Sequence, residues 1–162
     1  MDAMGQSERD LFVRTPRQQR VVALAATLAD QFAERAGRHD DDSSFPYENF
    51  AVLRSSGYAR LTVPAEFGGD GANLVELLLA QERLARGDGS TALGIGWHLS
   101  LMGKLTETRA WPAPTYERIC REVAGQGALL NSVASEVETG SPSRGGRPTT
   151  TARPAPDGGW VL

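Results

Sequence analysis

The feature that most constrains this chain is a change of pattern at Gly125-Gln126-Gly127. Before this point, apolar residues recur at the spacing of helices; after it, short β-branched runs alternate with turn residues, as in strands. A helical pattern does not settle into a sheet, so the two parts are expected to fold differently. We therefore predict a mainly α chain. A helical bundle of about five helices occupies residues 1–126, and the first strands of an incomplete β-domain occupy residues 127–162.

Start and stop signals divide the first part into helices. Thr15, Pro16 and Gln18 form a capping box that starts the first helix, and Gly37 can end it. Residues 40–44 are then expected to form a solvated linker. Further helices are predicted over residues 46–56, 74–86 and 90–102, the second of these starting at a capping box of Asn73 and Glu76. Pro112 and Pro114 break the chain before a fifth helix, which carries Tyr116, Ile119, Cys120 and Val123. The fourth of the five is apolar all round, which is typical of a helix buried inside a bundle.

The connections carry weaker signals. Residues 58–63 are apolar and are expected to be extended, with Pro64 ending the run. The glycines at 68, 69 and 71 predict a flexible connector, because the Lys-Ser/Thr of a phosphate loop does not follow them. After Gly127, strands are predicted over residues 128–134 and 149–152, with a loop over 142–148. The turn Thr139-Gly140-Ser141 offers N–H groups and hydroxyls to an anion or a planar ring.

Composition excludes several classes of protein. The net charge is −3 and no basic patch occurs, which argues against nucleic acid as a partner. No run approaches the roughly 20 apolar residues of a membrane helix, and residues 1–8 are unlike a signal peptide. Cys120 is the single cysteine, which fits a reducing cytoplasm, and it is expected to pack on a helix face. The acids at 40–42 do not converge, so no metal site is predicted.

The order of short motifs resembles the acyl-CoA dehydrogenase family of flavoproteins. A short helix ends at Gly57, and an extended turn follows it. A helix ending Glu82-Arg83-Leu84-Ala85-Arg86 precedes the helix start Asp88-Gly89-Ser90. The turn itself reads Val63-Pro64-Ala65-Glu66-Phe67-Gly68-Gly69. Later, Ser135-Glu136 with Gly140-Ser141 resembles the flavin-contacting loop of the family, and residues 157–162 resemble the hairpin after it.

The resemblance implies a helical N-terminal domain, a middle β-domain and a C-terminal helical bundle. Because this chain stops just after the hairpin, where a strand has barely begun, it is expected to be a fragment that lacks the last part. The family places FAD between the β-domain and the C-terminal helices, and its catalytic glutamate usually belongs to those helices. No catalytic residue is therefore assigned in this chain.

Site residues also follow from the resemblance. It implies FAD contacts from one segment and one turn, namely Ser132, Val133, Ala134, Ser135, Gly140 and Ser141. Ser141 and His98 are the expected substrate contacts. Each has a structural alternative: Ser141 can cap a turn, and His98 beside Trp97 can be a packing residue with satisfied nitrogens. Glu136 is expected to accept backbone hydrogen bonds as a structural acid.

The implied activity is α,β-dehydrogenation of an acyl-CoA thioester, with the fragment itself inactive. Val137 stands where the family usually has Pro, and Pro142 where it usually has Asp. These departures keep open a flavin-dependent monooxygenase on the same scaffold, and a non-catalytic truncated helical fragment is a further alternative. The expected partners are acyl-CoA or another small-molecule substrate. The full-length form is expected to be a homo-oligomer, a tetramer or dimer.

Overall fold

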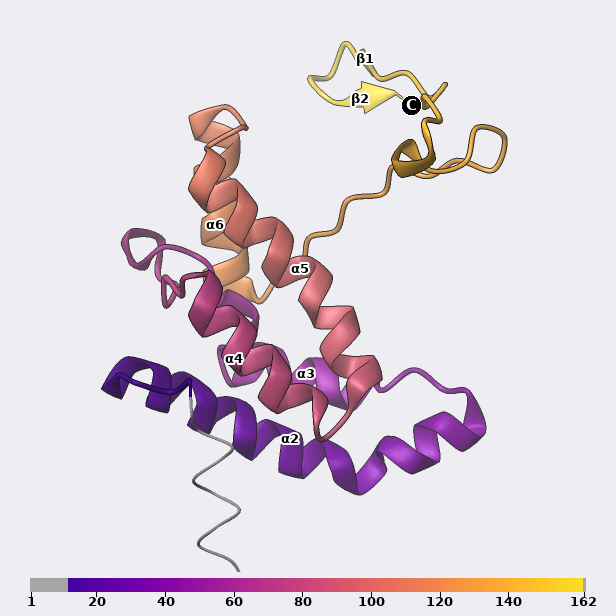
Figure 1. The fold of residues 1–162 in the computed structure, drawn as a ribbon. Helices are drawn as coiled ribbons and strands as arrows, with labels where there is room; N and C mark the ends of the chain where they lie inside the picture. The colour runs from indigo at the N-terminus through magenta and orange to yellow at the C-terminus, as the bar shows by residue number, and fades with distance from the viewer. Residues whose placement is uncertain (1–11, 162) are drawn as a thin grey trace, which may run out of the picture. The chain divides into compact units, whose positions relative to one another are not determined.

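The computed structural model describes residues 12–161, so the expectation for residues 1–8 lies outside the described part. The described residues form five α-helices, which confirms the mainly α prediction (Figure 1). The helices are α2 (Pro16–Asp42), α3 (Tyr47–Ser55), α4 (Leu74–Ala85), α5 (Gly89–Thr108) and α6 (Ala113–Gln126). The chain divides into two compact units after Asn131.

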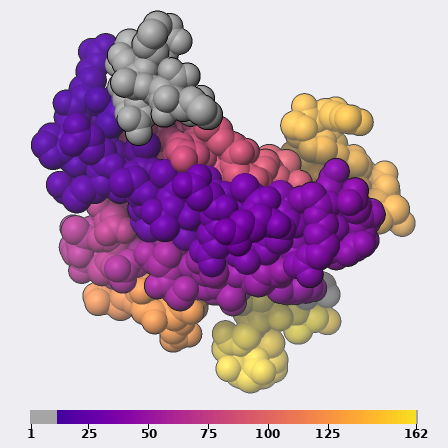
Figure 2. Space-filling model, turned by 90° about the horizontal axis from the view of Figure 1, so that it is seen from below, coloured from indigo at the N-terminus to yellow at the C-terminus, as the bar shows by residue number. Residues whose placement is uncertain are grey.

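The core of the helical unit lies between α2, α4 and α5. α2 lies along α4 and crosses one face of the unit, as Figure 2 shows. Its buried side chains recur at helical spacing: Val21, Ala25, Leu28, Ala29 and Phe32. The turn after α4 passes very close to α2, because a Cβ built on Gly87 would lie 2.0 Å from the carbonyl oxygen of Ala29. Only glycine fits at that crossing.

A buried polar network ties α2, α3 and the start of α5 together. Asp88 caps α5, with Oδ1 accepting from the Thr91 amide at 3.0 Å and Oδ2 from the Thr91 hydroxyl at 2.6 Å. Asn49 donates to Asp88 Oδ2 at 3.1 Å and to Thr91 Oγ1 at 2.9 Å, and its own Oδ1 accepts from Arg35 Nε at 2.5 Å. Asn49 and Thr91 are fully buried, so these groups depend on one another for their hydrogen bonds.

Helix boundaries differ from the prediction at α2 and at α5, which continues past the predicted end at Met102 to Thr108. The capping boxes at Thr15 and Asn73 are present. However, α2 runs through Gly37 and ends at Asp42, so the expected linker over 40–44 was wrong for its acidic part. Gly37 lies inside the helix with open space around it, and the helix ends instead at Ser43, which adopts a left-handed conformation. Residues 58–63 are not extended but begin with the 3-10 helix η1 (Tyr58–Arg60).

The composition of α5 predicted burial on every side, but the helix is buried on one side only. One side carries Ile95, His98, Leu99 and Met102 in the core, whereas Leu93 and Trp97 are 67% and 64% exposed. Gly69 sits in the connection before α4, where a Cβ would lie 2.1 Å from the Val63 carbonyl oxygen. The glycine connector is therefore a tight turn against residues 60–63 rather than a flexible one.

The second unit, residues 132–161, holds one hairpin. β1 (Arg153–Pro154) pairs antiparallel with β2 (Trp160–Val161), in the register Arg153 with Val161 and Pro154 with Trp160. The strands predicted over 128–134 and 149–152 do not form, because their backbone finds no neighbouring strand among the described residues. A single bridge joins Glu136 to Gly140, and the 3-10 helix η3 (Pro142–Arg144) follows. None of the described helices combines the length and apolar composition that a membrane crossing requires.

Asn49→Leu should lower the free energy of unfolding by about 1–3 kcal/mol, because the buried Asp88 and Thr91 oxygens lose a donor. Urea unfolding followed by circular dichroism measures this change. Asp30→Asn, which removes only an exposed ion pair to Arg83, is the matched control and should change stability by less than about 1 kcal/mol. Equal effects of the two substitutions would contradict the importance of the network.

Candidate functional site

The predicted cofactor segment, residues 132–135, is exposed along its whole length. Within the described residues, the backbone amides of Val133, Ala134 and Ser135 have no hydrogen-bond partner in the protein. The Val133 side chain is 87% exposed. A short run of free N–H groups beside a serine hydroxyl fits the ring nitrogens and carbonyl oxygens of a planar heteroaromatic ligand.

The turn after this segment is held by its own backbone. The Glu136 amide donates to the Gly140 carbonyl at 3.2 Å, and the Gly140 amide donates to the Glu136 carbonyl at 2.9 Å. Gly140 has a φ of 72°, in the left-handed region that favours glycine. The predicted contact residue Gly140 therefore shapes the turn, and its contact with a cofactor stays a prediction.

The Glu136 carboxylate joins this turn to residues 149–150. Its Oε2 accepts from the Thr149 amide at 2.7 Å and hydroxyl at 2.9 Å, and from the Thr139 hydroxyl at 3.0 Å. Its Oε1 accepts from the Thr150 amide at 2.8 Å. Hydrogen bonds from the Thr150 side chain, and from the Thr149 and Thr150 amides, lower the pKa of Glu136 to about 2. Glu136 is therefore the structural acid that the sequence predicted.

Ser141 caps the short helix η3. Its Oγ accepts from the Ser143 amide at 3.3 Å and lies 2.8 Å from the Ser143 hydroxyl. This is the turn-capping alternative. Contacts of Ser141 with flavin or substrate stay predictions.

His98 lies in the helical unit, in the middle of α5, and is 2% exposed. Its Nε2 lies 2.8 Å from the Ala59 carbonyl oxygen, and its Nδ1 lies 2.9 Å from the Leu130 amide nitrogen. Burial lowers the pKa of His98 below its ordinary value, and the two backbone hydrogen bonds oppose that shift. Both ring nitrogens are thus occupied by the protein itself, as in the packing alternative, and a substrate contact stays a prediction.

The structure gathers the predicted residues into two sets. Residues 132–135 and the turn 136–141 are contiguous in the second unit, whereas His98 belongs to the first. Sequence reasoning missed Thr149, Thr150 and Leu130 as partners of these groups. No local signal could identify them, because Thr149 lies 13 residues from Glu136 and Leu130 lies 32 residues from His98.

An apolar surface covers the outer side of α4 and α5. Leu74 and Leu78 on α4 are each 59% exposed, and Leu93 and Trp97 lie exposed on α5. Beside them is a hollow of about 460 Å³, lined by Gln81, Ala85, Gly89, Ala92, Leu93, Gly96, Trp97 and Ser100. Both ends of the Gln81 side-chain amide are hydrogen-bonded within the protein: it donates to the Ala92 carbonyl at 2.9 Å and accepts from the Tyr58 hydroxyl at 2.9 Å. The hollow therefore favours apolar groups.

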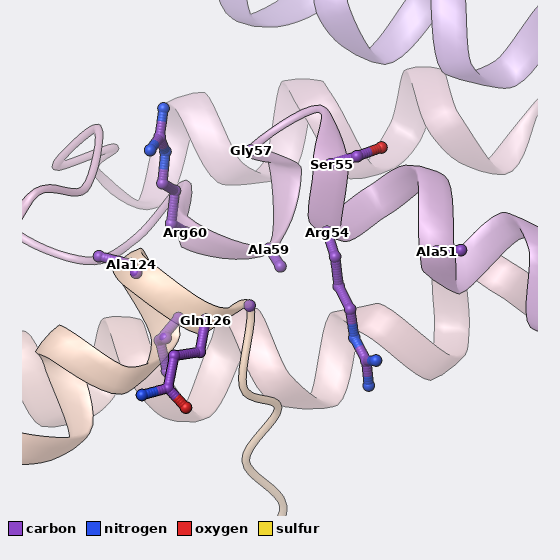
Figure 3. A pocket seen from close by; sticks show the side chains of 11 residues that line it. Ala51, Arg54, Ser55, Gly57, Ala59, Arg60, Ala124 and Gln126 are labelled. Atoms are coloured by element: carbon purple, nitrogen blue, oxygen red, sulfur yellow. The ribbon is translucent and has the colours of Figure 1, made fainter.

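A second hollow of about 460 Å³ lies between α3, η1 and the end of α6 (Figure 3). Arg54 and Arg60 line it, and neither has an acidic partner among the described residues. Figure 3 shows their guanidinium groups pointing away from one another. The two charges therefore do not converge on one anion. Residues 12–161 also contain no group of three or more His, Cys, Asp or Glu side chains that could hold a metal ion.

Comparison with known proteins gives one family and several relatives. Residues 15–108 match the family described as "Acyl-CoA dehydrogenase, N-terminal domain". The Bacillus subtilis protein named "Putative acyl-CoA dehydrogenase YdbM" is 43% identical over 152 residues, which are 94% of this chain and 39% of that protein. The chain thus spans about two fifths of the length of this relative.

Solved structures extend the comparison to other chemistry. A nitrososynthase from Micromonospora carbonacea var. africana is 35% identical, with a TM-score of 0.64 over 72% of this chain and 33% of that one. KijD3, solved with FMN and a dTDP-linked amino keto sugar, is 33% identical, with a TM-score of 0.65 over 71% of this chain and 30% of that one. The scaffold of this chain is therefore shared by proteins whose names describe different activities.

We expect acid to destabilise the second unit, because protonation of Glu136 weakens the hydrogen bonds that its carboxylate accepts. Its pKa is about 2 in the folded protein and 4.5 ordinarily, so its stabilising contribution is complete above about pH 4.5 and is lost as the pH falls towards 2. The protection factors of the Thr149 and Thr150 amides, which correct for the intrinsic pH dependence of exchange, should fall as the pH is lowered across this range. In Glu136→Gln, these protection factors should already be low at neutral pH and should change little with acid. Unchanged exchange in the variant would refute the role of the carboxylate, and Glu138→Gln is the matched control.

Proposed function

The chain belongs to the acyl-CoA dehydrogenase family, and we propose that it forms the N-terminal part of a flavin-dependent oxidoreductase that acts on a small molecule. Residues 1–126 would be the helical domain, and residues 127–162 the beginning of the middle β-domain. The resemblance further suggests a homo-oligomer for the complete protein.

The observation that carries this proposal is the exposed segment 132–135 ahead of a turn fixed by Glu136. The unpaired amides of Val133, Ala134 and Ser135 and the Ser135 hydroxyl fit a flavin ring. Ser132, Gly140 and Ser141 complete the proposed set. We propose FAD as the cofactor. When bound, the flavin would supply a two-electron acceptor, while this chain would bind and orient it. The carboxylate of Glu136 is fully engaged in hydrogen bonds, so it is not proposed as a base.

The proposed reaction is α,β-dehydrogenation of an acyl-CoA thioester. The relative named as an acyl-CoA dehydrogenase, 43% identical, supports this choice. The apolar hollow beside Leu93 and Trp97 also supports it, because its lining suits an acyl group and offers few free polar atoms.

A flavin-dependent monooxygenase is the second candidate. It is favoured by the solved nitrososynthase and by KijD3, whose structure holds FMN and a nucleotide sugar. Val137 and Pro142, which depart from the usual dehydrogenase loop, point the same way. A related protein named "Probable FMNH2-dependent monooxygenase SfnC", from Pseudomonas putida, is 33% identical over 113 residues.

Flavin binding tests the cofactor proposal. The chain is joined to the C-terminal part of the Bacillus relative and titrated with FAD and with FMN, following flavin fluorescence. Ser135→Ala should weaken binding by roughly two- to twelvefold, since one hydrogen bond is worth about 0.5–1.5 kcal/mol. Ser90→Ala, at an exposed serine of α5, is the matched control. Absence of flavin binding in this chimera would refute the proposed function.

The same chimera separates the two reactions. Dehydrogenation predicts that an acyl-CoA reduces an artificial electron acceptor without oxygen. Narrowing the hollow with a larger side chain at its exposed rim, by Ala85→Leu, should then lower kcat/KM for long acyl chains more than for short ones. Turnover that requires reduced flavin and oxygen, with no acyl-CoA oxidation, would favour the monooxygenase instead.

A further inference from the structure

A hydrogen bond from the Leu130 amide to His98 Nδ1 joins the segment that leaves the helical unit after α6 to the middle of α5. The Leu130 amide can only donate, so the Nδ1 of His98 must be unprotonated. The Ala59 carbonyl can only accept, so the Nε2 must carry the hydrogen. The two contacts therefore fix a neutral imidazole in the Nε2–H tautomer. They also fix the orientation of the ring.

The contact with Leu130 comes at a particular place in the chain. Ala128 and Leu130 pack against the core cluster that contains Val63, Met102 and Cys120. Asn131 is the last residue of the helical unit, and the exposed segment 132–135 follows. The His98 imidazole thus holds the backbone two residues before the segment begins.

We propose that His98 is a positioning residue, which fixes the point from which the flavin-contacting segment 132–135 leaves the helical unit. It acts through the Leu130 amide and not by touching the substrate or the cofactor. Packing of the Leu130 side chain sets the distance of this backbone from the core. The hydrogen bond sets the rotation of the peptide group between Leu129 and Leu130, just before Asn131 and Ser132. This role rests on the proposed function, since it matters for activity only where that segment binds flavin.

Two conservative variants separate the contacts of the ring. Asn places an acceptor oxygen near the position of Nδ1, and Gln places an amide N–H near the position of Nε2. His98→Asn should therefore keep the Leu130 contact and lose the one to Ala59. His98→Gln should do the reverse. Ile95→Val, one turn earlier and equally buried, is the matched control for lost packing on α5.

The first measurement uses the chain itself and no flavin. In ¹⁵N NMR, His98→Gln should speed amide exchange at Leu130 by about three- to tenfold relative to its neighbours, and lower the heteronuclear NOE of residues 133–135. His98→Asn and Ile95→Val should leave both close to the unmutated chain. Equal effects of Gln and Asn, or no effect of either, would overturn the proposal in favour of a role in shape alone.

A measurement on the unmutated chain covers the case in which the variants fail to fold. The ring ¹⁵N shifts of His98 should report the Nε2–H tautomer, with an unprotonated Nδ1, at neutral pH. A protonated Nδ1 would overturn the proposal.

Flavin titration of the chimera then tests the link to function. His98→Gln should weaken flavin binding several-fold, and His98→Asn should restore most of it. Failure of the unmutated chimera to bind flavin would refute the proposed function but not the exchange result. Normal flavin binding by His98→Gln, with Leu130 exchange accelerated, would refute the positioning role.

Discussion

The structure depends on the buried carboxylate of Asp88 at the start of α5. An ionised group is costly to bury unless donors surround it, and here three donors do: the Thr91 amide, the Thr91 hydroxyl and the Asn49 side chain. The position also places negative charge at the positive end of the helix. Because Asn49 in turn accepts from Arg35, one carboxylate fixes α5 against both α3 and α2. The close crossing at Gly87, one residue earlier, completes this junction.

Two further polar groups use the same chemistry farther along the chain. His98 binds the backbone carbonyl of Ala59 in η1 and the backbone amide of Leu130 after α6. The Glu136 carboxylate accepts hydrogen bonds from the Thr149 and Thr150 amides and from the Thr139 and Thr149 hydroxyls, although these residues form no sheet with Glu136. In each case a side chain pairs with backbone groups that have no backbone partner among the described residues. The proposed cofactor segment 132–135 lies between these two groups in the sequence, and the amides of Val133, Ala134 and Ser135 have no hydrogen-bond partner among the described residues.

The helices could be predicted from the sequence because their start signals come from residues close together in the chain. The long-range contacts could not be predicted, because they depend on the fold. The caps at Thr15 and Asn73 involve residues three apart, so they can be read from the sequence. The Gly37 prediction failed because glycine permits a helix end but does not impose one. The exposure of Trp97 was missed because composition does not say how many sides of a helix find neighbours. The partners of Glu136 and His98, which come from distant segments, need the fold itself, although a structural role for each was among the alternatives.

The polar groups of the helical unit also explain why its scaffold can serve different reactions. Asn49, Thr91 and His98 direct their hydrogen bonds to other parts of the same unit, as do Tyr58 and Gln81. What the unit presents beside α5 is an apolar wall, formed by Leu93 and Trp97 over small residues. Such a wall discriminates by size and shape, and a methylene more or less changes affinity only about 10- to 200-fold. It can hold an acyl chain or another apolar group without committing the protein to proton abstraction or oxygen transfer. Differences in chemistry between relatives of one scaffold therefore do not require a different helical unit, only different groups around the flavin.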